Sequence, residues 1–349
     1  MVVSHQDLQA FCIQAMTACG MSEHDARTTA NVLVTNDLLG IFTHGTKCLR
    51  GYLKRMRAGG LNAAAVPEII REGPAWAVLD GHSAMAMVTC CKAMDVAIEK
   101  ARTTGIAYAG VKNSCHIAAA GFYALMAARQ DMIGLSMSNE NPSMTVPGAR
   151  GPIIGTNPFA VAIPAGEEKP VLLDIATSTV AASKVYAAVS QGKPIPNNWI
   201  VDKEGIPTTD GSLYPHSAYM LPMAGHKGYG LALMIEVLSA LLSSGASRND
   251  VMGWVHHDPS KPTGQCHAFI AINVGAIVPL DVFKSRMDEM IRDVRRSPKA
   301  KGSDRIYLPG EMEWEKYDKA TKSGIPLPED VVENLRGLAD DLGMEFKMG

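Results

Sequence analysis

The apolar residues near the start of the chain recur every three or four positions, which is the spacing of amphipathic helices. Leu8, Phe11 and Ala15 form one such row, and a second row starts at Ala26. Each row follows a serine with an aspartate three positions later, an arrangement that resembles a capping box. We therefore predict two helices here and a third over 46–58, which should stop at the glycine pair that follows it.

From Trp76 onward, short apolar runs alternate with longer segments of helical periodicity. Two stretches rich in proline and glycine, 148–158 and 192–207, are predicted to be loops. This alternation predicts an α/β protein in which strands and helices share one core. The strands are expected over 77–81, 106–111, 133–137, 159–163, 171–175 and 269–273, and the helices over 85–104, 118–129, 227–242, 280–294 and 328–342.

The bulk composition narrows the classes of function. The 349 residues carry a net charge of −2, so no basic surface for nucleic acid is expected. The most apolar helical stretch, 231–242, contains Glu236 and is too short to span a bilayer, so no membrane segment is expected. The first residues lack the pattern of a signal peptide, and the seven cysteines show no CxxC spacing. Together these features predict a cytoplasmic protein with reduced thiols.

Two histidines are set among small residues that leave room for a ligand. His44 lies between Thr43 and a glycine, and His116 is followed closely by three alanines and a glycine. Imidazole exchanges a proton near neutral pH, and small neighbours let a ligand approach the ring. His44 is predicted in the turn before the third helix, and His116 in a strand-to-helix loop, where α/β enzymes often place chemistry. The plain alternative is a pair of ordinary histidines at helix ends.

Three further positions carry candidate binding chemistry. Lys227 is at the predicted start of a helix, where its ammonium group and the free backbone N–H groups could hold a phosphate or carboxylate. Asp174 ends a predicted strand and could accept ribose hydroxyl groups or cap a helix. Thr156 lies in a tight Gly-Thr-Asn-Pro turn that brings two side-chain hydrogen-bonding groups. A solvated lysine, a helix cap and a simple turn are the corresponding structural explanations.

Familiar cofactor and metal motifs are missing. No GxGxxG follows a predicted strand, and the sequence has no Walker A loop, GxSxG or HExxH. His256, His257 and Asp258 form a compact cluster of metal donors, but neighbouring residues on an extended segment point to opposite sides. We therefore predict no metal site and keep a metal-dependent hydrolase as a rival.

The order of several segments along the chain is more specific than any one of them. They are THG at Thr43, VLDG at Val78, NSCHIAAAGFYA at Asn113, MIGLSMSNENP at Met132, GTNPFAVAIP at Gly155, LLDIATS at Leu172, WIVDKEGIPTTD at Trp199, GHKGYGLALMIEVLSALL at Gly225 and DRIYLPGE at Asp304. With these segments the chain resembles the malate/L-lactate dehydrogenase family, whose members are NAD(P)-dependent 2-hydroxyacid oxidoreductases distinct from the Rossmann-fold lactate dehydrogenases. The resemblance runs through nearly the whole chain and accounts for the missing GxGxxG.

The resemblance implies an α/β fold with a family-specific, non-Rossmann cofactor-binding domain and a mostly helical domain built from both termini. The expected division is a helical part over 1–75, a cofactor-binding α/β domain over 76–275 and a C-terminal segment over 276–349 that returns to the helical domain. It also implies a homodimer with its site between the domains and near the partner subunit, and a bound NAD or NADP.

The resemblance also implies roles for individual residues. His116, His44 and Thr43 match catalytic positions, and the family does not agree on which histidine carries the proton. Cys48, Tyr52 and Thr156 are assigned to the substrate. The cofactor is expected to contact Asn139, Glu140, Asp174, Ile175, Ala176, Lys227, Gly302, Ser303 and Asp304.

One departure from the family pattern concerns the substrate. The family often has an arginine four positions after the histidine of its Ser-His-Gly motif, where a guanidinium can grip a carboxylate with two hydrogen bonds. Cys48 stands at that position, and the flanking Lys47 and Arg50 point elsewhere on a helix.

We therefore expect hydride transfer between NAD(P) and a small 2-hydroxy or 2-oxo acid such as malate, lactate or ureidoglycolate. The alternatives are a cyclic-imine reductase of the same family and an inactive cofactor-binding homologue.

Overall fold

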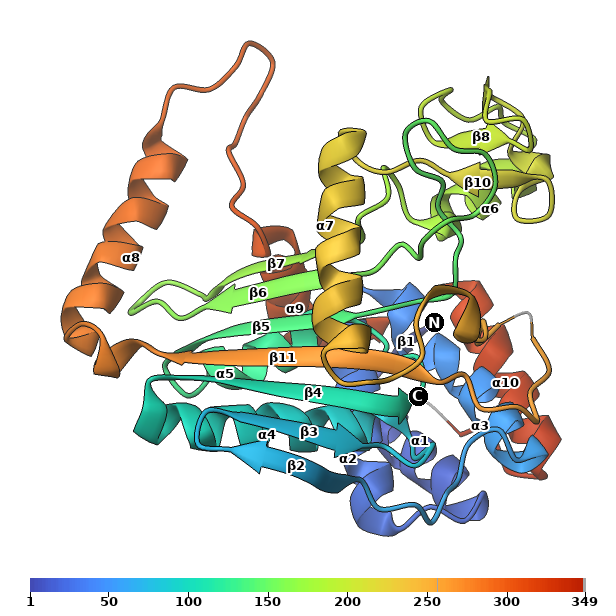
Figure 1. Ribbon diagram of the computed structural model, residues 1–349, viewed down its shortest axis with the longest axis horizontal. Helices are drawn as coiled ribbons and strands as arrows, with labels where there is room; N and C mark the ends of the chain where they lie inside the picture. Colours follow the sequence, from blue (N-terminus) through green and yellow to red (C-terminus); the bar gives the residue numbers. More distant parts are fainter. Residues whose placement is uncertain (256, 348–349) are drawn as a thin grey trace.

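A seven-stranded mixed sheet forms the centre of the computed structural model, which describes residues 1–255 and 257–347 (Figure 1). The strand order is β2-β3-β4-β11-β5-β6-β7, and only β3 and β4 run parallel among neighbouring strands of this sheet. The β4, β5 and β7 strands end at the edge where β6 and β11 begin. The strands are β2 (Glu68–Gly73), β3 (Trp76–Asp80), β4 (Ile106–Ser114), β5 (Met132–Ser138), β6 (Phe159–Ile163), β7 (Val171–Ile175) and β11 (Gln265–Asn273).

Helices cover both faces of this sheet. The α4 (Ala86–Thr104) and α5 (Gly121–Ala128) helices pack on one face, and α7 (His226–Glu236) crosses the other (Figure 1). Gly134 of β5 lets α5 approach closely, because a Cβ there would overlap the carbonyl oxygen of Ala124. The sheet, α4, α5 and the helices from both ends of the chain therefore enclose one large apolar core, and a separate small cluster lies under α7.

Helices from both ends of the chain gather beside one edge of the sheet. They are α1 (His5–Ala18), α2 (Glu23–Leu38), α3 (Leu49–Ala58), α9 (Glu311–Ser323) and α10 (Glu329–Leu342). The α10 helix packs on α1 and α3, and β1 (Val2–Val3) pairs with β12 (Ile325–Pro326), so the two ends of the chain are tied together. This arrangement confirms the predicted fold class, an α/β sheet domain with a helical layer from both termini.

The predicted N-terminal helices are confirmed together with their caps. The Ser4 hydroxyl accepts a hydrogen bond from the Asp7 N–H and donates one to the Asp7 carboxylate. Ser22 and Asp25 repeat the same pair of bonds at the start of α2. The third helix ends at Gly59, which adopts a left-handed φ of 96°.

The prediction that 192–207 is entirely loop is wrong. It contains β8 (Ile200–Asp202), which lies in a small sheet between β9 (Pro207–Thr208) and β10 (Ala218–Met220). Its run of apolar residues is too short to be distinguished from the surrounding loop residues by periodicity.

The helix expected over 118–129 begins only at Gly121, since Ala118 has a φ of 62° that a helix does not allow.

Two helices have features that the sequence pattern did not predict. The predicted helix 227–242 is α-helical to Glu236 and then continues as a π-helical turn, η4 (Val237–Leu241). The α8 helix (Leu280–Arg296) lies at one side of the sheet, where the Asp288 carboxylate accepts from the N–H groups of Gly166, Glu167 and Glu168 in the turn between β6 and β7 (Figure 1). The sequence pattern did not predict β2, α6 (Ala182–Ser190) or α9. Within residues 1–255 and 257–347, no helix combines the length and apolar character needed to cross a membrane.

The close approach of α5 to β5 predicts a large effect of one methyl group. Gly134→Ala should lower the free energy of unfolding by about 1–3 kcal/mol, because the added Cβ forces helix and strand apart. Gly230→Ala is the matched control, since a Cβ there meets nothing within 4 Å and alanine favours the helix. Urea unfolding measures both variants, and equal stability of the two would contradict this packing.

Candidate active site

The structure brings the two predicted histidines together at the sheet edge beside the helical layer. His44 ends η1 (Phe42–His44), a short 3-10 turn that precedes α3, and His116 lies in the loop after β4. Their ring centroids are 5.5 Å apart, and both side chains are partly buried. The helical layer and the sheet therefore each contribute one imidazole to a common site.

Tyr52 of α3 completes this cluster. Its hydroxyl oxygen lies 2.6 Å from His116 Nδ1, and either partner can donate this hydrogen bond, depending on the imidazole tautomer. The Tyr52 side chain is 1% exposed, and burial raises its pKa well above the usual value, so the phenol keeps its proton. The bond orients the His116 ring and leaves Nε2 for a substrate.

The turn that carries His44 is fixed by polar groups of α2. The Asn36 amide donates to the His44 carbonyl oxygen at 2.8 Å. The Asp37 carboxylate accepts from the Thr46 N–H at 3.1 Å and from its hydroxyl at 2.6 Å. A Cβ at Gly45 would overlap Asp37 Oδ1, so only glycine fits this turn. Burial raises the pKa of Asp37 to about 7.

Burial also keeps both histidines neutral. It lowers the pKa of His44, and it lowers that of His116 further with the help of nearby His44 and His267. His267, on β11, is fully buried, its Nδ1 lies 2.9 Å from the Ser138 hydroxyl, and burial lowers its pKa to about 3. The Thr43 hydroxyl is 2.9 Å from His44 Nδ1. Neutral imidazoles can take up or share a proton with a ligand.

The thiol of Cys48 is buried and uncharged. It is 5% exposed, donates to the Thr43 carbonyl oxygen at 3.2 Å, and burial raises its pKa to about 12. Lys47 and Arg50 form ion pairs with carboxylates of α10 at the surface. The position where the family often has a guanidinium therefore holds a buried, uncharged group.

Two residues of this site, Trp254 and Arg55, are not predicted by the sequence pattern. Trp254 stacks on His116 with ring centroids 4.4 Å apart and planes 12° from parallel, and on Tyr52 at 5.2 Å. Arg55 of α3 is 2% exposed and donates to backbone carbonyls of the loop that carries Trp254. No periodicity or motif marks either residue, because both act through contacts between distant segments.

The predicted substrate and cofactor residues on the sheet lie close to one another. The Asp174 carboxylate, at the end of β7, accepts from the Gly121 N–H at 2.8 Å, and burial raises its pKa to about 6. This bond connects β7 to the first turn of α5, directly after the His116 loop. The Thr156 hydroxyl donates to Glu140 at 2.7 Å, and its carbonyl oxygen accepts from the Thr177 N–H at 2.9 Å.

The start of α7 adjoins the same strand end. The Met223 N–H donates to the Thr177 carbonyl oxygen at 2.9 Å, which brings the exposed Lys227 near the segment that contains Ile175 and Ala176. No side chain caps this helix start. A lysine and free backbone N–H groups at an exposed helix start suit an anion such as a dinucleotide pyrophosphate.

Asn139 has an internal partner for each polar atom of its side chain. Its oxygen accepts from the Cys266 N–H at 2.7 Å, and its amide donates to Glu236 and to the Ala246 carbonyl oxygen. The side chain is fully buried. Asn139 therefore supports the end of β5 from within, and its assignment to the cofactor, like that of Glu140, stays a prediction.

The remaining predicted cofactor residues, Gly302, Ser303 and Asp304, lie in the exposed loop between α8 and α9. This loop extends away from the sheet (Figure 1). The hydrogen bonds of Ser303 are local, from its N–H to the Ala300 carbonyl oxygen and from its hydroxyl to that of Arg305. The structure does not bring this turn to the histidine cluster.

The metal alternative gains no support from the part of the chain that the structure describes. Among those residues, no group of three histidine, cysteine, aspartate or glutamate side chains is placed to hold a metal ion. His256 lies outside the described residues. The neighbouring His257 accepts from the Gly253 N–H through Nδ1 at 3.1 Å, which braces a turn.

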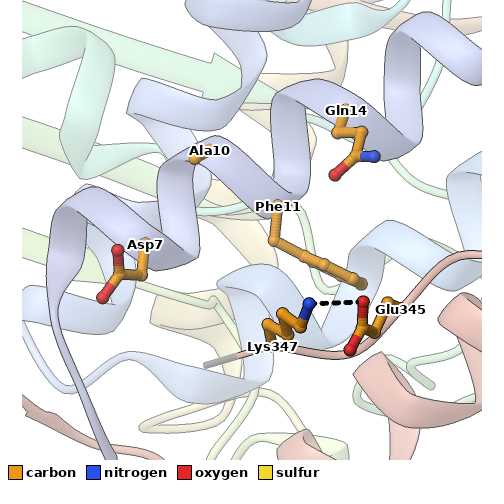
Figure 2. Close-up of a pocket in the computed structure, with 6 residues that line it drawn as sticks. All are labelled: Asp7, Ala10, Phe11, Gln14, Glu345 and Lys347. Carbon is orange, nitrogen blue, oxygen red and sulfur yellow. Dashed lines mark ion pairs between the residues drawn. The ribbon is translucent and has the colours of Figure 1, made fainter. Parts of the chain in front are cut away.

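A groove between α1 and the C-terminal segment is separate from the histidine cluster. Figure 2 shows its polar side chains, including an ion pair between Lys347 and Glu345 at 2.6 Å. It holds none of the predicted catalytic or binding residues. The groove is lined by Asp7, Ala10, Phe11, Gln14, Glu345 and Lys347.

Comparison with known proteins identifies the family. The profile of the malate/L-lactate dehydrogenase family matches residues 3–336. The chain belongs to the malate/L-lactate dehydrogenase family. It is 39% identical to a malate dehydrogenase from Pyrococcus abyssi, over 98% of this chain and 95% of that protein. It is 32% identical to a ureidoglycolate dehydrogenase (NAD(+)) from Escherichia coli, over 96% of this chain and 95% of that protein.

The fold agrees with this dehydrogenase family. A crystal structure of malate dehydrogenase from Entamoeba histolytica superposes with a TM-score of 0.93 at 33% identity, over 99% of each chain. The family predicted from the ordered segments is therefore confirmed, and so is a dehydrogenase fold without a Rossmann fingerprint. The substitution at Cys48 is a local departure within an otherwise matching chain.

The buried carboxyl of Asp37 predicts a pH-dependent stability. Its folded-state pKa of about 7 lies above the usual value, so stability from this group is present in acid and lost as the pH rises toward 7. Asp37→Asn removes this loss, and the stability of the variant relative to the native protein should rise by about 2–4 kcal/mol between about pH 5 and pH 8. Urea unfolding at both pH values measures it, and a constant difference would show that Asp37 does not titrate in this range.

Proposed function

We propose that this dehydrogenase transfers a hydride between a nicotinamide cofactor, NAD or NADP, and C2 of a small 2-hydroxy or 2-oxo acid. One observation carries the proposal: His44 and His116, from two layers of the fold, meet as neutral imidazoles with Tyr52 bonded to His116. A neutral imidazole that is partly open to a ligand can exchange a proton with a hydroxyl or carbonyl oxygen. Family membership supplies the reaction class.

His116 is proposed as the main proton carrier, with Nε2 facing the substrate. In the oxidation direction Nε2 takes the proton of the substrate hydroxyl, and the Tyr52 hydroxyl accepts a hydrogen bond from Nδ1. In reduction the same steps run in reverse: the doubly protonated ring keeps its Nδ1–H bond to the Tyr52 hydroxyl oxygen and returns the Nε2 proton to the substrate oxygen. His44, held by Thr43, is the second polar group beside the reacting oxygen.

A nicotinamide cofactor supplies or takes up the hydride when it is bound. The residues proposed to hold it are those at the end of β7 and the start of α7: Asp174, Ile175, Ala176 and Lys227. Glu140 and Thr156 lie beside them. The turn of Gly302, Ser303 and Asp304 remains a proposed cofactor contact on the strength of the family resemblance.

The substrate is proposed to be small, with Thr156 and Tyr52 among its polar contacts. Cys48 supplies no positive charge, so the substrate carboxylate needs a donor other than the usual arginine. A cyclic imine is the second candidate, because it can be reduced at the same pair of histidines. An inactive cofactor-binding protein is the third.

A substrate panel separates these candidates. Purified protein is mixed with 2-oxo acids and cyclic imines, each with NADH and NADPH, and cofactor absorbance is followed. Turnover of 2-oxo acids supports the proposal, and turnover of imines alone shifts it to the second candidate. Cofactor binding without any turnover contradicts it.

The histidines are tested by substitution. His116→Ala and His44→Ala should each lower kcat by about 100-fold or more, because a positioned acid–base group contributes a factor of that order. The exposed His24 of α2 is the control, and His24→Ala should retain activity. Circular dichroism confirms the fold of each variant. Full activity in both active-site variants would overturn the assignment.

We also propose a homodimer. Large apolar side chains lie exposed along one side of α7 and η4, and α8 presents a second apolar row. Exposed apolar stripes of this kind are typical of subunit interfaces. A second copy of this chain is the proposed occupant. The residues are Leu233, Met234, Val237, Leu241 and Leu242 on the first stripe, and Val282, Met290 and Val294 on the second.

Light scattering after size exclusion tests the dimer. The native protein should have twice the 37.3 kDa chain mass, and Leu241→Glu should give the mass of one chain, because a buried unpaired charge disfavours the interface. The equally exposed Ile206 is the control, and Ile206→Glu should remain dimeric. A native protein of single-chain mass would contradict the proposal.

The division of the chain into 1–75, 76–275 and 276–349 remains our proposal for its domains. We also place the enzyme in the cytoplasm. Seven free thiols in the described part of the chain support this location.

A further inference from the structure

Arg55 is a buried cation whose described hydrogen-bond partners are all backbone carbonyls. Nε donates to Trp254 at 2.6 Å, and Nη2 donates to Gly253 at 3.0 Å and His257 at 3.2 Å. Nη1 donates to Asp258 at 3.3 Å and Lys261 at 3.1 Å. The side chain is 2% exposed, and burial lowers its pKa. One guanidinium thus binds the loop over 253–261 at five points.

A buried cation that forms no ion pair among the described residues is costly unless other polar groups compensate, and here five bonds to backbone carbonyls supply that compensation. Carbonyl dipoles converge on the guanidinium only while the loop keeps this conformation. A fork of five N–H donors in one plane fixes the loop in a way that the point charge of a lysine cannot. Because its N–H donors are occupied, Arg55 cannot bind a substrate carboxylate in place of the arginine that the family often has at position 48.

The loop held by Arg55 carries the indole of Trp254 onto the site. The ring lies nearly parallel to His116 at 4.4 Å and also stacks on Tyr52. Gly51 makes room for it, because a Cβ at that position would lie 3.0 Å from Trp254 Cζ3. Trp254 therefore covers one face of the imidazole.

We propose that Arg55 and Trp254 are positioning residues for the proton-carrying histidine. Arg55 fixes the loop, the loop fixes the indole, and the indole holds the plane of His116 and keeps water from one face. The substrate then reaches the ring only from the side of His44. This inference rests on the proposed function of His116.

The test compares two arginines of the same helix. Arg55→Lys should lower kcat about tenfold with little change in KM, because misorientation of a reacting group costs rate more than binding. It should also shift Trp254 emission, taken as the difference between each protein and its Trp254→Phe counterpart, to longer wavelength. Arg57→Lys is the control and should change neither, since Arg57 is exposed and its one described hydrogen bond reaches the Asp341 carbonyl oxygen.

A second pair of variants keeps the test valid if Arg55→Lys does not fold. Trp254→Phe keeps an aromatic face on His116 and should retain most of kcat, whereas Trp254→Leu should lose about tenfold. Equal activity of these two variants overturns the proposal. So does an Arg55→Lys enzyme with native emission and native kcat, or one in which only KM rises, which would make Arg55 a substrate anchor.

The two proposals fail in different ways. Full activity of His116→Ala would remove the proposed function and the positioning role with it. The Trp254 emission of Arg55→Lys reports the loop clamp without any assay of activity. If His116→Ala loses activity while Arg55→Lys keeps native emission and native kcat, only the positioning role is overturned.

Discussion

The hydrogen bond between Tyr52 and His116 spans the two layers of this molecule, and the site depends on it. Tyr52 belongs to α3 and His116 follows β4, so the bond forms only when the helical layer is docked on the sheet edge. That docking needs both ends of the chain, because α10 packs on α3 and β1 pairs with β12. The helices built from the two termini therefore hold one half of the catalytic cluster, and the sheet holds the other.

The second constraint is electrostatic. Burial keeps the imidazoles neutral, the Tyr52 phenol protonated and the Cys48 thiol uncharged. Arg55, a buried cation close to this site, donates its described hydrogen bonds to backbone carbonyls. A neutral imidazole can accept a proton, but a site built from neutral groups provides no positive charge to bind a carboxylate. This difference from the usual family pattern concerns substrate choice more than the reaction.

Local patterns predicted the elements well where the pattern is long or sharply bounded. The β6 and β7 strands match their predicted bounds, and the serine caps of α1 and α2 are present as expected. The β8 strand was missed because its three residues lie between proline-rich turns. The histidines could be found from their small neighbours, whereas Trp254 and Arg55 could not. Their contacts are to a distant ring and to backbone carbonyls, and neither kind of contact leaves a periodic pattern in the sequence.

In the proposed reaction the cofactor carries the hydride and this chain carries the proton. A reduced nicotinamide cofactor that bears deuterium at its hydride-donating carbon tests this division. The product of the best 2-oxo acid substrate is then analysed by mass spectrometry and NMR. We expect deuterium at C2 of the hydroxy acid in ordinary water, and none at C2 when an unlabelled cofactor is used in D2O. Deuterium at C2 from the solvent, or none from the labelled cofactor, would contradict it.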